Sequence, residues 1–459
     1  MRHSCLLLAM LTCGITLVGN TSLPNPLLTP DTSGVLATYS KKGSINLANP
    51  FFQVLGTNGR TCGSCHVASD GWTVTPVHLQ ARFSISQGLD PIFRPVDGAN
   101  CPSADISTVE ARRQAYSMLL SKGVIRVSIG VPANADFKLL AINDPHDCPE
   151  TTEAGLALFR RPLPAADLPF LTTVMWDGRE TLPGKSLLAD LEDQALGATM
   201  GHAQASAPPS QAQLQSIAEF ESSNYYAQLF DQRAGNLNSH GATGGPFRLS
   251  TQPFHVGIND PLGGDPTGAK FNPVAFSLFS SWSQLPESNG PEEEASATTR
   301  LAIARGESLF NTHTFTISGV AGLNDRPGVA ASFTGTCTTC HNTPNVGNHS
   351  TAMPLNIGVS DYPARSGLDI SGLPVYTFEC DSGNTVQTTD PGRALISGKC
   401  SDIGKVKGPV LRGLAARAPY FHNGSAPTLS DVVDFYQRRF DFKLSEQQKQ
   451  DLIAFLKSL

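Results

Sequence analysis

The feature that most constrains this chain is a short cysteine motif that occurs twice. Residues 60–72 read RTCGSCHVASDGW, and residues 335–344 read GTCTTCHNTP. In both segments two cysteines stand three positions apart, and a histidine directly follows the second cysteine. A single motif of this kind can arise by chance. Two copies in one chain need one chemical explanation that accounts for both.

Three kinds of site use paired cysteines. The two cysteine pairs of a four-thiolate zinc site usually lie about 15–20 residues apart. Here one pair begins at residue 62 and the other at residue 337, which is much farther apart. A thioredoxin-like redox pair needs a βαβ context that neither segment has. In C-x-x-C-H, the thiols bond to the haem vinyl groups and the histidine becomes the proximal iron ligand. We therefore predict two covalent haems c, one held by Cys62, Cys65 and His66 and the other by Cys337, Cys340 and His341.

The N-terminal residues predict export. The chain begins MRHSCLLLAMLTCGITLVGNTS, with a short basic start, an apolar run over residues 5–18 and then small polar residues. This pattern is typical of a secretory signal peptide, here residues 1–22, and places the mature protein in the periplasm or outside the cell. No segment reaches the about 18 apolar residues of a membrane span. The net charge of −6 disfavours nucleic acid as a partner, because nucleic acid requires a basic face.

Eight of the ten cysteines lie beyond this leader. In an oxidising compartment, those that hold no haem are expected in disulfides. The pairings closest in sequence are Cys101 with Cys148 and Cys380 with Cys400. Sequence alone also allows other connectivities.

The length of 459 residues predicts more than one domain. Each haem motif is expected in a helical cytochrome c-like unit, with a helix over residues 298–311 ahead of the second motif. A closing helix over 445–459 is predicted to begin with the capping-box pair Ser445 and Gln448. The predicted fold class is mainly α: two cytochrome c-like helical haem domains with long loop-rich and minor β insertions, including a strand within 123–131. The N-terminal haem domain is expected at 35–235, a loop-rich linker at 236–295 and the C-terminal haem domain at 296–459.

Two further segments resemble the bacterial diheme cytochrome c peroxidase family, which includes MauG. Residues 175–196 begin MWDGRE and end LEDQAL, and residues 409–439 read PVLRGLAARAPYFHNGSAPTLSDVVDFYQRR. Residues 75–165 and 236–294 show no such likeness. The resemblance implies that the N-terminal haem activates peroxide or oxygen, and that the C-terminal haem transfers or stores electrons.

The resemblance also implies roles for single residues. Trp176 matches a tryptophan that relays electrons or holes between the haems; the alternative is a buried core tryptophan. His422 matches a histidine near the C-terminal haem. Fourteen positions later, Tyr436 matches the other axial ligand of that haem, which is tyrosine in MauG and methionine in the peroxidases. A helix capped by Thr428 would turn Tyr436 inward, although a packing tyrosine with Met353 as the ligand is the alternative.

The pattern departs from the family at the first haem. Gln194 matches the family glutamine, but the glutamate expected ten positions later is replaced by Gln204, which cannot act as a general acid. Nearby His202 could move protons in its place, ligate the iron or lie on the surface. The distal side of the first iron is expected to be open or weakly ligated, because Arg82 stands where a closing histidine would be.

The family also binds a calcium ion between its domains, partly through main-chain carbonyl groups. The matching groups belong to Arg417 and Pro419. A carboxylate such as Asp90 or Asp97 would complete an oxygen shell. The alternative for these acids is a solvated loop.

Three functions stay open. The leading one is an exported diheme c-type oxidoreductase of the peroxidase/MauG type. It would use hydrogen peroxide or oxygen, with a small electron-donor protein (cytochrome c or cupredoxin) or a protein or organic substrate as partner. The second is a non-catalytic diheme electron-transfer cytochrome. The third is a diheme oxygenase related to the rubber-cleaving enzymes, which work without the peroxidase glutamate.

Overall fold

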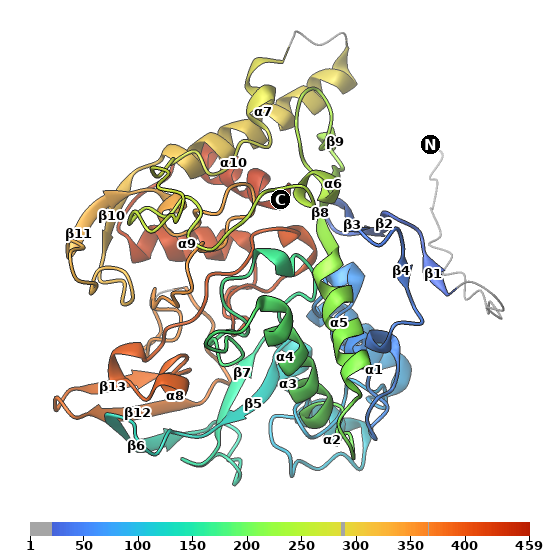
Figure 1. Ribbon diagram of the computed structural model, residues 1–459, viewed down its shortest axis with the longest axis vertical. Helices are drawn as coiled ribbons and strands as arrows, with labels where there is room; N and C mark the ends of the chain where they lie inside the picture. Colours follow the sequence, from blue (N-terminus) through green and yellow to red (C-terminus); the bar gives the residue numbers. More distant parts are fainter. Residues whose placement is uncertain (1–20, 286–289, 366) are drawn as a thin grey trace, which may run out of the picture.

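The computed structural model describes residues 21–285, 290–365 and 367–459 (Figure 1). The predicted signal peptide lies outside the described residues except for its last two positions. The described helices are α1 (Pro76–Ser86), α2 (Val109–Ala115), α3 (Ser117–Lys122), α4 (Leu187–Gly201), α5 (Gln211–Ser223), α6 (Pro246–Leu249), α7 (Pro291–Thr312), α8 (Ala394–Ser397), α9 (Leu429–Arg439) and α10 (Glu446–Lys457). The described strands are β1 (Ser22–Leu23), β2 (Leu27–Pro30), β3 (Gly34–Ser40), β4 (Ile45–Asn46), β5 (Ile125–Ile129), β6 (Phe137–Asn143), β7 (Leu156–Arg160), β8 (Asn224–Asp231), β9 (Gly235–Asn236), β10 (Phe315–Ser318), β11 (Ser332–Gly335), β12 (Val375–Cys380) and β13 (Thr385–Thr388).

The fold class is only partly the predicted one, because strands contribute more than minor insertions. They form small separate sheets: β1–β4, β5–β7, β10–β11, β2–β3–β8–β9 and β6–β12–β13. The strand predicted within residues 123–131 is confirmed as β5, which pairs antiparallel with β7. Helices α4 and α5 lie side by side in one half of the molecule, and α7, α9 and α10 lie in the other half (Figure 1).

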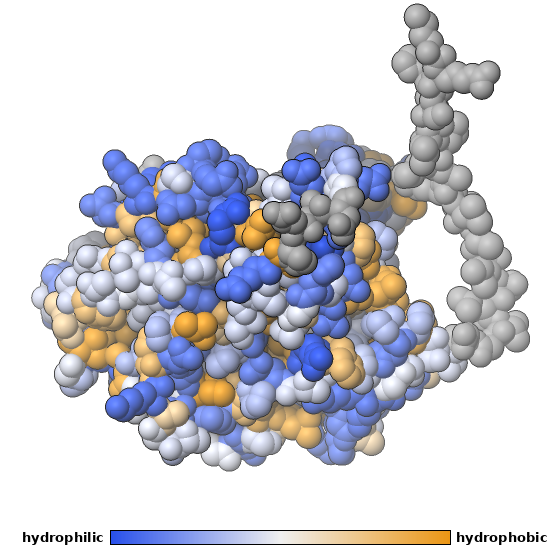
Figure 2. All heavy atoms as spheres, turned by 90° about the horizontal axis from the view of Figure 1, so that it is seen from above, coloured by the Kyte–Doolittle hydropathy of each residue, from blue (hydrophilic) through white to orange (hydrophobic). Residues whose placement is uncertain are grey.

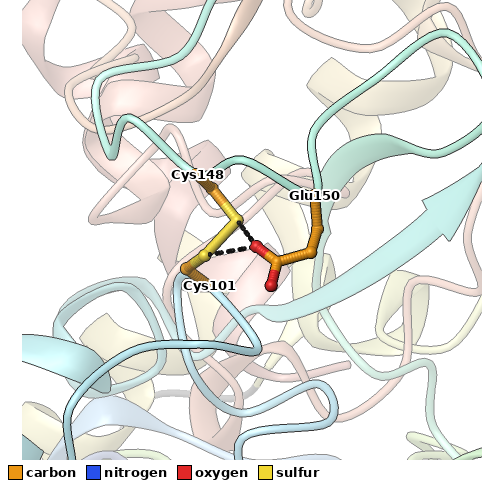
Figure 3. A group of neighbouring side chains, drawn as sticks. All are labelled: Cys101, Cys148 and Glu150. Carbon is orange, nitrogen blue, oxygen red and sulfur yellow. Dashed lines mark hydrogen bonds between the residues drawn. A yellow bond between two sulfur atoms is a disulfide. The ribbon is translucent and has the colours of Figure 1, made fainter.

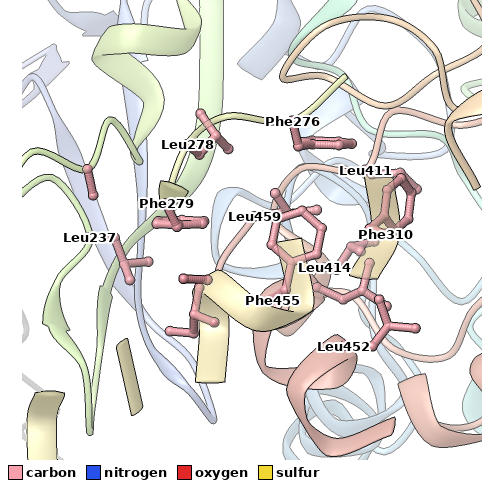
Figure 4. Packing of buried hydrophobic residues seen from close by; sticks show 14 of the residues in the cluster. Leu237, Phe276, Leu278, Phe279, Phe310, Leu411, Leu414, Leu452, Phe455 and Leu459 are labelled. Atoms are coloured by element: carbon pink, nitrogen blue, oxygen red, sulfur yellow. The ribbon is translucent and has the colours of Figure 1, made fainter. Parts of the chain in front are cut away.

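The core of the C-terminal half lies where α7 crosses α10 (Figure 4). The rings of Phe310 on α7 and Phe455 on α10 lie 5.7 Å apart. Gly306 makes this close crossing feasible, since a Cβ there would come within 2.0 Å of the Asp451 carbonyl oxygen. Burial of these apolar side chains is the main source of stability for the pair of helices.

The predicted helix starts are largely confirmed. Ser445 caps α10 in a capping box with Gln448, and Thr428 caps α9. Helix α7 begins at Pro291, several residues before the predicted start. The three acidic residues that follow Pro291 lie in its first turn, where the helix dipole favours negative charge.

Strand pairing joins parts of the chain that are distant in sequence. Strand β6 pairs antiparallel with β12, so that Phe137 lies opposite Cys380. The C-terminal residue is also tied back, because the Leu459 carbonyl accepts hydrogen bonds from the backbone N–H groups of Gln228 (3.2 Å) and Gly413 (3.0 Å). The two halves that carry the cysteine motifs are thus connected by main-chain hydrogen bonds.

Both predicted disulfides are present. The Cα atoms of Cys101 and Cys148 are 5.4 Å apart, and those of Cys380 and Cys400 are 5.8 Å apart. Figure 3 shows Glu150 beside the first disulfide, with its Oε2 atom 3.0 Å from the sulfur of Cys101 and 3.1 Å from that of Cys148. Because metals bind the thiolate form, these bonded sulfurs do not make a metal site.

A membrane span requires a helix that is both long and apolar. None of the helices in the described ranges is long and apolar enough to cross a bilayer. The face shown in Figure 2 mixes hydrophilic and hydrophobic side chains.

Candidate haem sites and the segment between them

The first motif is built as a preformed haem c site. Cys62 begins a 3-10 turn, and both Cys62 and Cys65 carry free thiols. The Nδ1–H of His66 donates to the Trp72 carbonyl at 3.1 Å, which leaves Nε2 as the ligand atom. Burial lowers the pKa of His66 and so favours the neutral form that binds metals.

The second motif repeats this geometry. Cys337 begins a 3-10 turn, and the thiols of Cys337 and Cys340 are free. The Nδ1–H of His341 donates to the Gly347 carbonyl at 2.6 Å. Burial lowers the pKa of His341 to about 4. Gly347 has a φ of 79° and would contact Phe276 through any added Cβ, so this turn requires glycine.

Each motif opens into a cavity lined mainly by apolar side chains. Two free thiols, an oriented neutral imidazole and an apolar cavity are what a covalently bound haem requires. The residues present therefore fit haem c at both sites.

Polar groups line one part of the first cavity. His202 lies in the lining, and its Nδ1–H donates to Asp97 Oδ2 at 2.5 Å. Arg60 pairs with the same carboxylate at 2.5 Å and also donates to the His202 carbonyl at 3.1 Å. Burial acts to raise the pKa of Asp97, but the hydrogen bond from His202 and the charge of Arg60 outweigh it and lower the pKa. His202 is thus held by a charged carboxylate, with Nε2 left for other contacts.

The other residues predicted at this site separate into two groups. Gln194 lines the first cavity, whereas Gln204 is exposed and lies outside the lining, with its side-chain oxygen 3.2 Å from Asn58 Nδ2. Arg82, which stands where a closing histidine would be, pairs with Asp90 and lies outside the lining. The nearby His78 bonds to Asp70 and also lies outside the lining.

Glu221 is a cavity residue that sequence reasoning missed. It lies on α5 one turn after Ile217, and both residues line the first cavity. Glu221 is 6% exposed, and its Oε2 atom has no hydrogen-bond partner. Burial raises its pKa to about 8, so the side chain is largely protonated at neutral pH. The signal available in the sequence was a glutamate four positions after Ile217, in a run whose apolar residues recur at helical spacing.

Tyr436 lines the second cavity beside the haem-attachment cysteines. It shares the lining with three other residues of α9, namely Leu429, Val432 and Val433. Burial raises the pKa of the phenol well above its usual value. Met353, the alternative ligand, lies outside the lining, and its sulfur contacts Arg326. The geometry thus favours Tyr436 over Met353.

Two histidines besides His341 line the second cavity. His422 is buried, with Nε2 at 3.3 Å from Ser360 Oγ. His349, which sequence reasoning missed, is 3% exposed and donates through Nδ1 to the Cys340 carbonyl at 3.1 Å. Its Nε2 atom has no hydrogen-bond partner. A third histidine only eight positions after His341 was the available signal.

A group of residues from three parts of the chain lines both cavities. Trp176, Lys407 and Arg161 are shared, together with Pro162 and Pro164. The indole Nε1–H of Trp176 donates to the Arg161 carbonyl at 2.8 Å, and its ring lies edge-on to His422 at 6.0 Å between centroids. Lys407 donates to the Thr173 carbonyl at 3.0 Å, and burial lowers its pKa to about 7.

Comparison with known proteins agrees with this geometry. Residues 407–443 match the family described as RoxA-like, cytochrome c-like. Over 140 residues the chain is 35% identical to cytochrome-c peroxidase IdrP2 of Denitromonas iodatirespirans. This match covers 27% of the present chain and 36% of IdrP2. It is 36% identical over 75 residues to cytochrome c peroxidase Ccp of Escherichia coli (strain K12), 16% of each chain. These local matches support the resemblance to the diheme cytochrome c peroxidase family.

The likeness to these relatives is local. The matched segments span 36% of the length of IdrP2 and 16% of the length of Ccp. A solved MauG-like protein associated with microbial copper homeostasis aligns over 96% of this chain and 95% of its own, with 17% identity and a TM-score of 0.38.

The calcium site implied by the family does not fit the residues present. Asp90 is paired with Arg82 at 2.5 Å, and Asp97 is engaged by Arg60 and His202. The Arg417 carbonyl accepts a hydrogen bond from the Arg161 guanidinium at 3.1 Å, so a positive charge already stands there. Pro419 lies in the lining of the second cavity. We therefore do not retain a calcium ion at these residues.

Proposed function

We propose that this protein is an exported diheme c-type oxidoreductase of the cytochrome c peroxidase/MauG type. Haem c at the first site would activate peroxide or oxygen, and haem c at the second site would transfer or store electrons. Hydrogen peroxide is the favoured oxidant, since the curated relatives are named cytochrome c peroxidases. A small electron-donor protein or a protein or organic substrate would complete the reaction in the periplasm or outside the cell.

The observation that carries this proposal is the position of Trp176. Its side chain lines both cavities and is 8% exposed. The hydrogen bond to Arg161 and the edge contact with His422 fix the indole plane. An aromatic ring held rigidly between two redox sites supports a relay of electrons or holes between them.

His202 supplies the proton chemistry in this proposal. The Asp97 carboxylate accepts a hydrogen bond from the Nδ1–H of His202 and so fixes the tautomer and the orientation of the ring. His202 Nε2 then holds or moves a proton at the wall of the first cavity. This arrangement would replace the missing family glutamate, because an imidazole exchanges protons near neutral pH.

Spin state and reactivity test the proposal together. In the resting ferric holoprotein, the first haem should be high-spin and should react with hydrogen peroxide. Two low-spin haems that do not react with peroxide would instead identify an electron carrier.

A pair of tryptophan variants tests the relay. Trp176→Phe should slow electron transfer between the two haems while both remain covalently attached. Trp282→Phe is the matched control, because Trp282 is fully buried in the α7–α10 core and lines neither cavity. Equal transfer rates in the two variants would remove Trp176 from the path.

A diheme oxygenase related to the rubber-cleaving enzymes is the second candidate. It is favoured by the RoxA-like match over residues 407–443 and by the exposed Gln204 in place of the acid. The distinguishing assay measures dioxygen uptake with polyisoprene against peroxide consumption with reduced cytochrome c. Uptake only with the polymer would favour the oxygenase.

A further inference from the structure

The guanidinium of Arg161 lies buried where three separate parts of the chain meet. Its Nη1 atom donates to the Lys122 carbonyl at 3.1 Å. Its Nη2 atom donates to the carbonyls of Val74 at 2.8 Å and Arg417 at 3.1 Å. Two of these carbonyls belong to the N-terminal half and one to the C-terminal half, so a single cation bridges both.

The charge of Arg161 is met by carbonyl oxygens alone. In the described part of the chain, Arg161 forms no ion pair with a carboxylate. The neighbouring Arg160 is different, since it pairs with Asp177 at 2.5 Å and with Asp390 at 2.7 Å. A cation held by main-chain oxygens resembles the coordination of a hard metal ion such as calcium.

The surrounding backbone is shaped to admit this side chain. Gly123, which ends α3 with a φ of 62°, would bring a Cβ within 2.7 Å of the Arg161 Nη1 atom. Gly424 from the C-terminal half would bring one within 2.8 Å of the Lys122 carbonyl oxygen. Both positions lack a side chain where one would push the guanidinium or its acceptor away.

The main chain of Arg161 forms hydrogen bonds with two residues that line the second cavity, Trp176 and His422. Its carbonyl accepts from the Trp176 indole at 2.8 Å, and its N–H donates to the His422 carbonyl at 2.6 Å. A shift of this residue would therefore move both aromatic side chains.

We propose that Arg161 is a built-in cation that replaces an interdomain calcium ion and positions Trp176 and His422 between the two haem sites. The positioning of Trp176 rests on the proposed relay, whereas the replacement of calcium does not. Arg161 acts as a positioning residue through its contacts with other parts of the chain.

The first test is metal content. The purified holoprotein should contain no stoichiometric calcium by atomic emission, and excess EGTA should leave its melting temperature and haem spectrum unchanged. One tightly held calcium per chain whose removal lowers the melting temperature would overturn the proposal. This readout needs no peroxide turnover, so it stays separate from failure of the proposed function.

The second test compares two arginine variants. Arg161→Ala should lower the melting temperature and slow electron transfer between the haems, and added Ca²⁺ should restore part of both losses by binding the freed carbonyls. Arg439→Ala is the matched control, because Arg439 also donates to three carbonyls, those of Ser318, Gly319 and Ile357, all within the C-terminal half. Its interhaem transfer and its response to Ca²⁺ should equal those of the wild type.

The outcomes are decisive even if Arg161→Ala does not fold. Gly123→Ala keeps the arginine but crowds it, and it should slow interhaem transfer without loss of covalent haem. Normal transfer in Gly123→Ala, or an Arg161→Ala variant indistinguishable from Arg439→Ala, would overturn the proposal.

Discussion

The two cavities of this protein differ in the chemistry of their walls. The first brings together Glu221, His202 and Gln194, with Asp97 directly behind the imidazole. The second is walled by aromatic rings, including those of Tyr436, Phe310, Phe315, Phe421, Phe440 and Phe442. Titratable groups suit proton movement. The second cavity also holds His349 and His422, but its larger aromatic surface suits electron exchange.

This contrast suggests a division of labour within one chain. Reduction of peroxide consumes protons as well as electrons, so only the site that meets the oxidant needs acids and bases. The four predictions below would each sharpen that contrast or remove it.

The largest effect concerns haem attachment. The double variants Cys62→Ala/Cys65→Ala and Cys337→Ala/Cys340→Ala should each remove one covalent haem, because both thioether bonds at that site are lost. The measurement is haem staining after denaturing electrophoresis together with the haem-to-protein ratio. Replacing Cys101 and Cys148 by serine should keep both haems, since these residues form a disulfide. Full stain in either double variant would contradict the two-haem assignment.

The next effect is confined to the first cavity. His202→Ala should slow peroxide consumption by about 10²–10⁴-fold, the usual contribution of general acid–base catalysis. Asp97→Asn should cause a smaller loss, because the imidazole remains but its orientation is weakened. Gln204→Ala is the control, since that side chain is exposed and outside the lining. An unchanged rate in His202→Ala would place its side chain outside the chemistry.

A smaller effect is expected in the second cavity. Tyr436→Phe should alter the spectrum of the second haem, and Tyr436→Met should raise its potential, because axial ligands shift haem potentials within a range of about 0.8 V. A phenolate stabilises ferric iron, whereas a thioether favours ferrous iron. Potentiometric titration provides the measurement. A change in Met353→Ala instead of Tyr436→Phe would contradict the assignment.

The smallest effect is a change in pH dependence. Burial raises the pKa of Glu221 from 4.5 to about 8, so the folded protein holds this proton more tightly than the unfolded chain. Its contribution to the free energy of unfolding is complete below pH 4.5 and is lost as the pH rises to about 8. Between these pH values, the free energy of unfolding should therefore fall less steeply with pH in Glu221→Gln than in the wild type, by up to about 1.4 kcal/mol per pH unit.

Urea denaturation at several pH values within the window measures this slope. Glu219→Gln is the control, because Glu219 is exposed and its pKa is lowered by its hydrogen bonds with Lys42 and Gln215. If the free energy of unfolding has the same pH dependence in Glu221→Gln and the wild type, Glu221 does not keep its proton in the folded cavity.

Local patterns predicted the local features of this structure. The caps at Thr428 and Ser445 were readable because a capping box requires defined side chains at fixed spacing. The inward position of Tyr436 followed from helical periodicity. The start of α7 was misplaced because its acidic first turn was assigned to the preceding segment.

Features made by the backbone could not be predicted in this way. The pairing of β6 with β12 joins strands distant in sequence, and nothing in either strand specifies its partner. The cluster around Arg161 uses carbonyl oxygens of three distant residues, and a carbonyl has no signature in the sequence. The burial of Glu221 and His349 depends on neighbours that only the folded chain supplies.

The pairing of β6 with β12 also bears on how the protein is made. A ribosome has to synthesise more than half of the chain after β6 before its partner strand exists. During that interval the edge of β6 is exposed, and exposed strand edges favour association between nascent chains. Because β12 lies in the C-terminal half, the sheet that joins the two halves closes only after that half is available, in whichever compartment the chain folds.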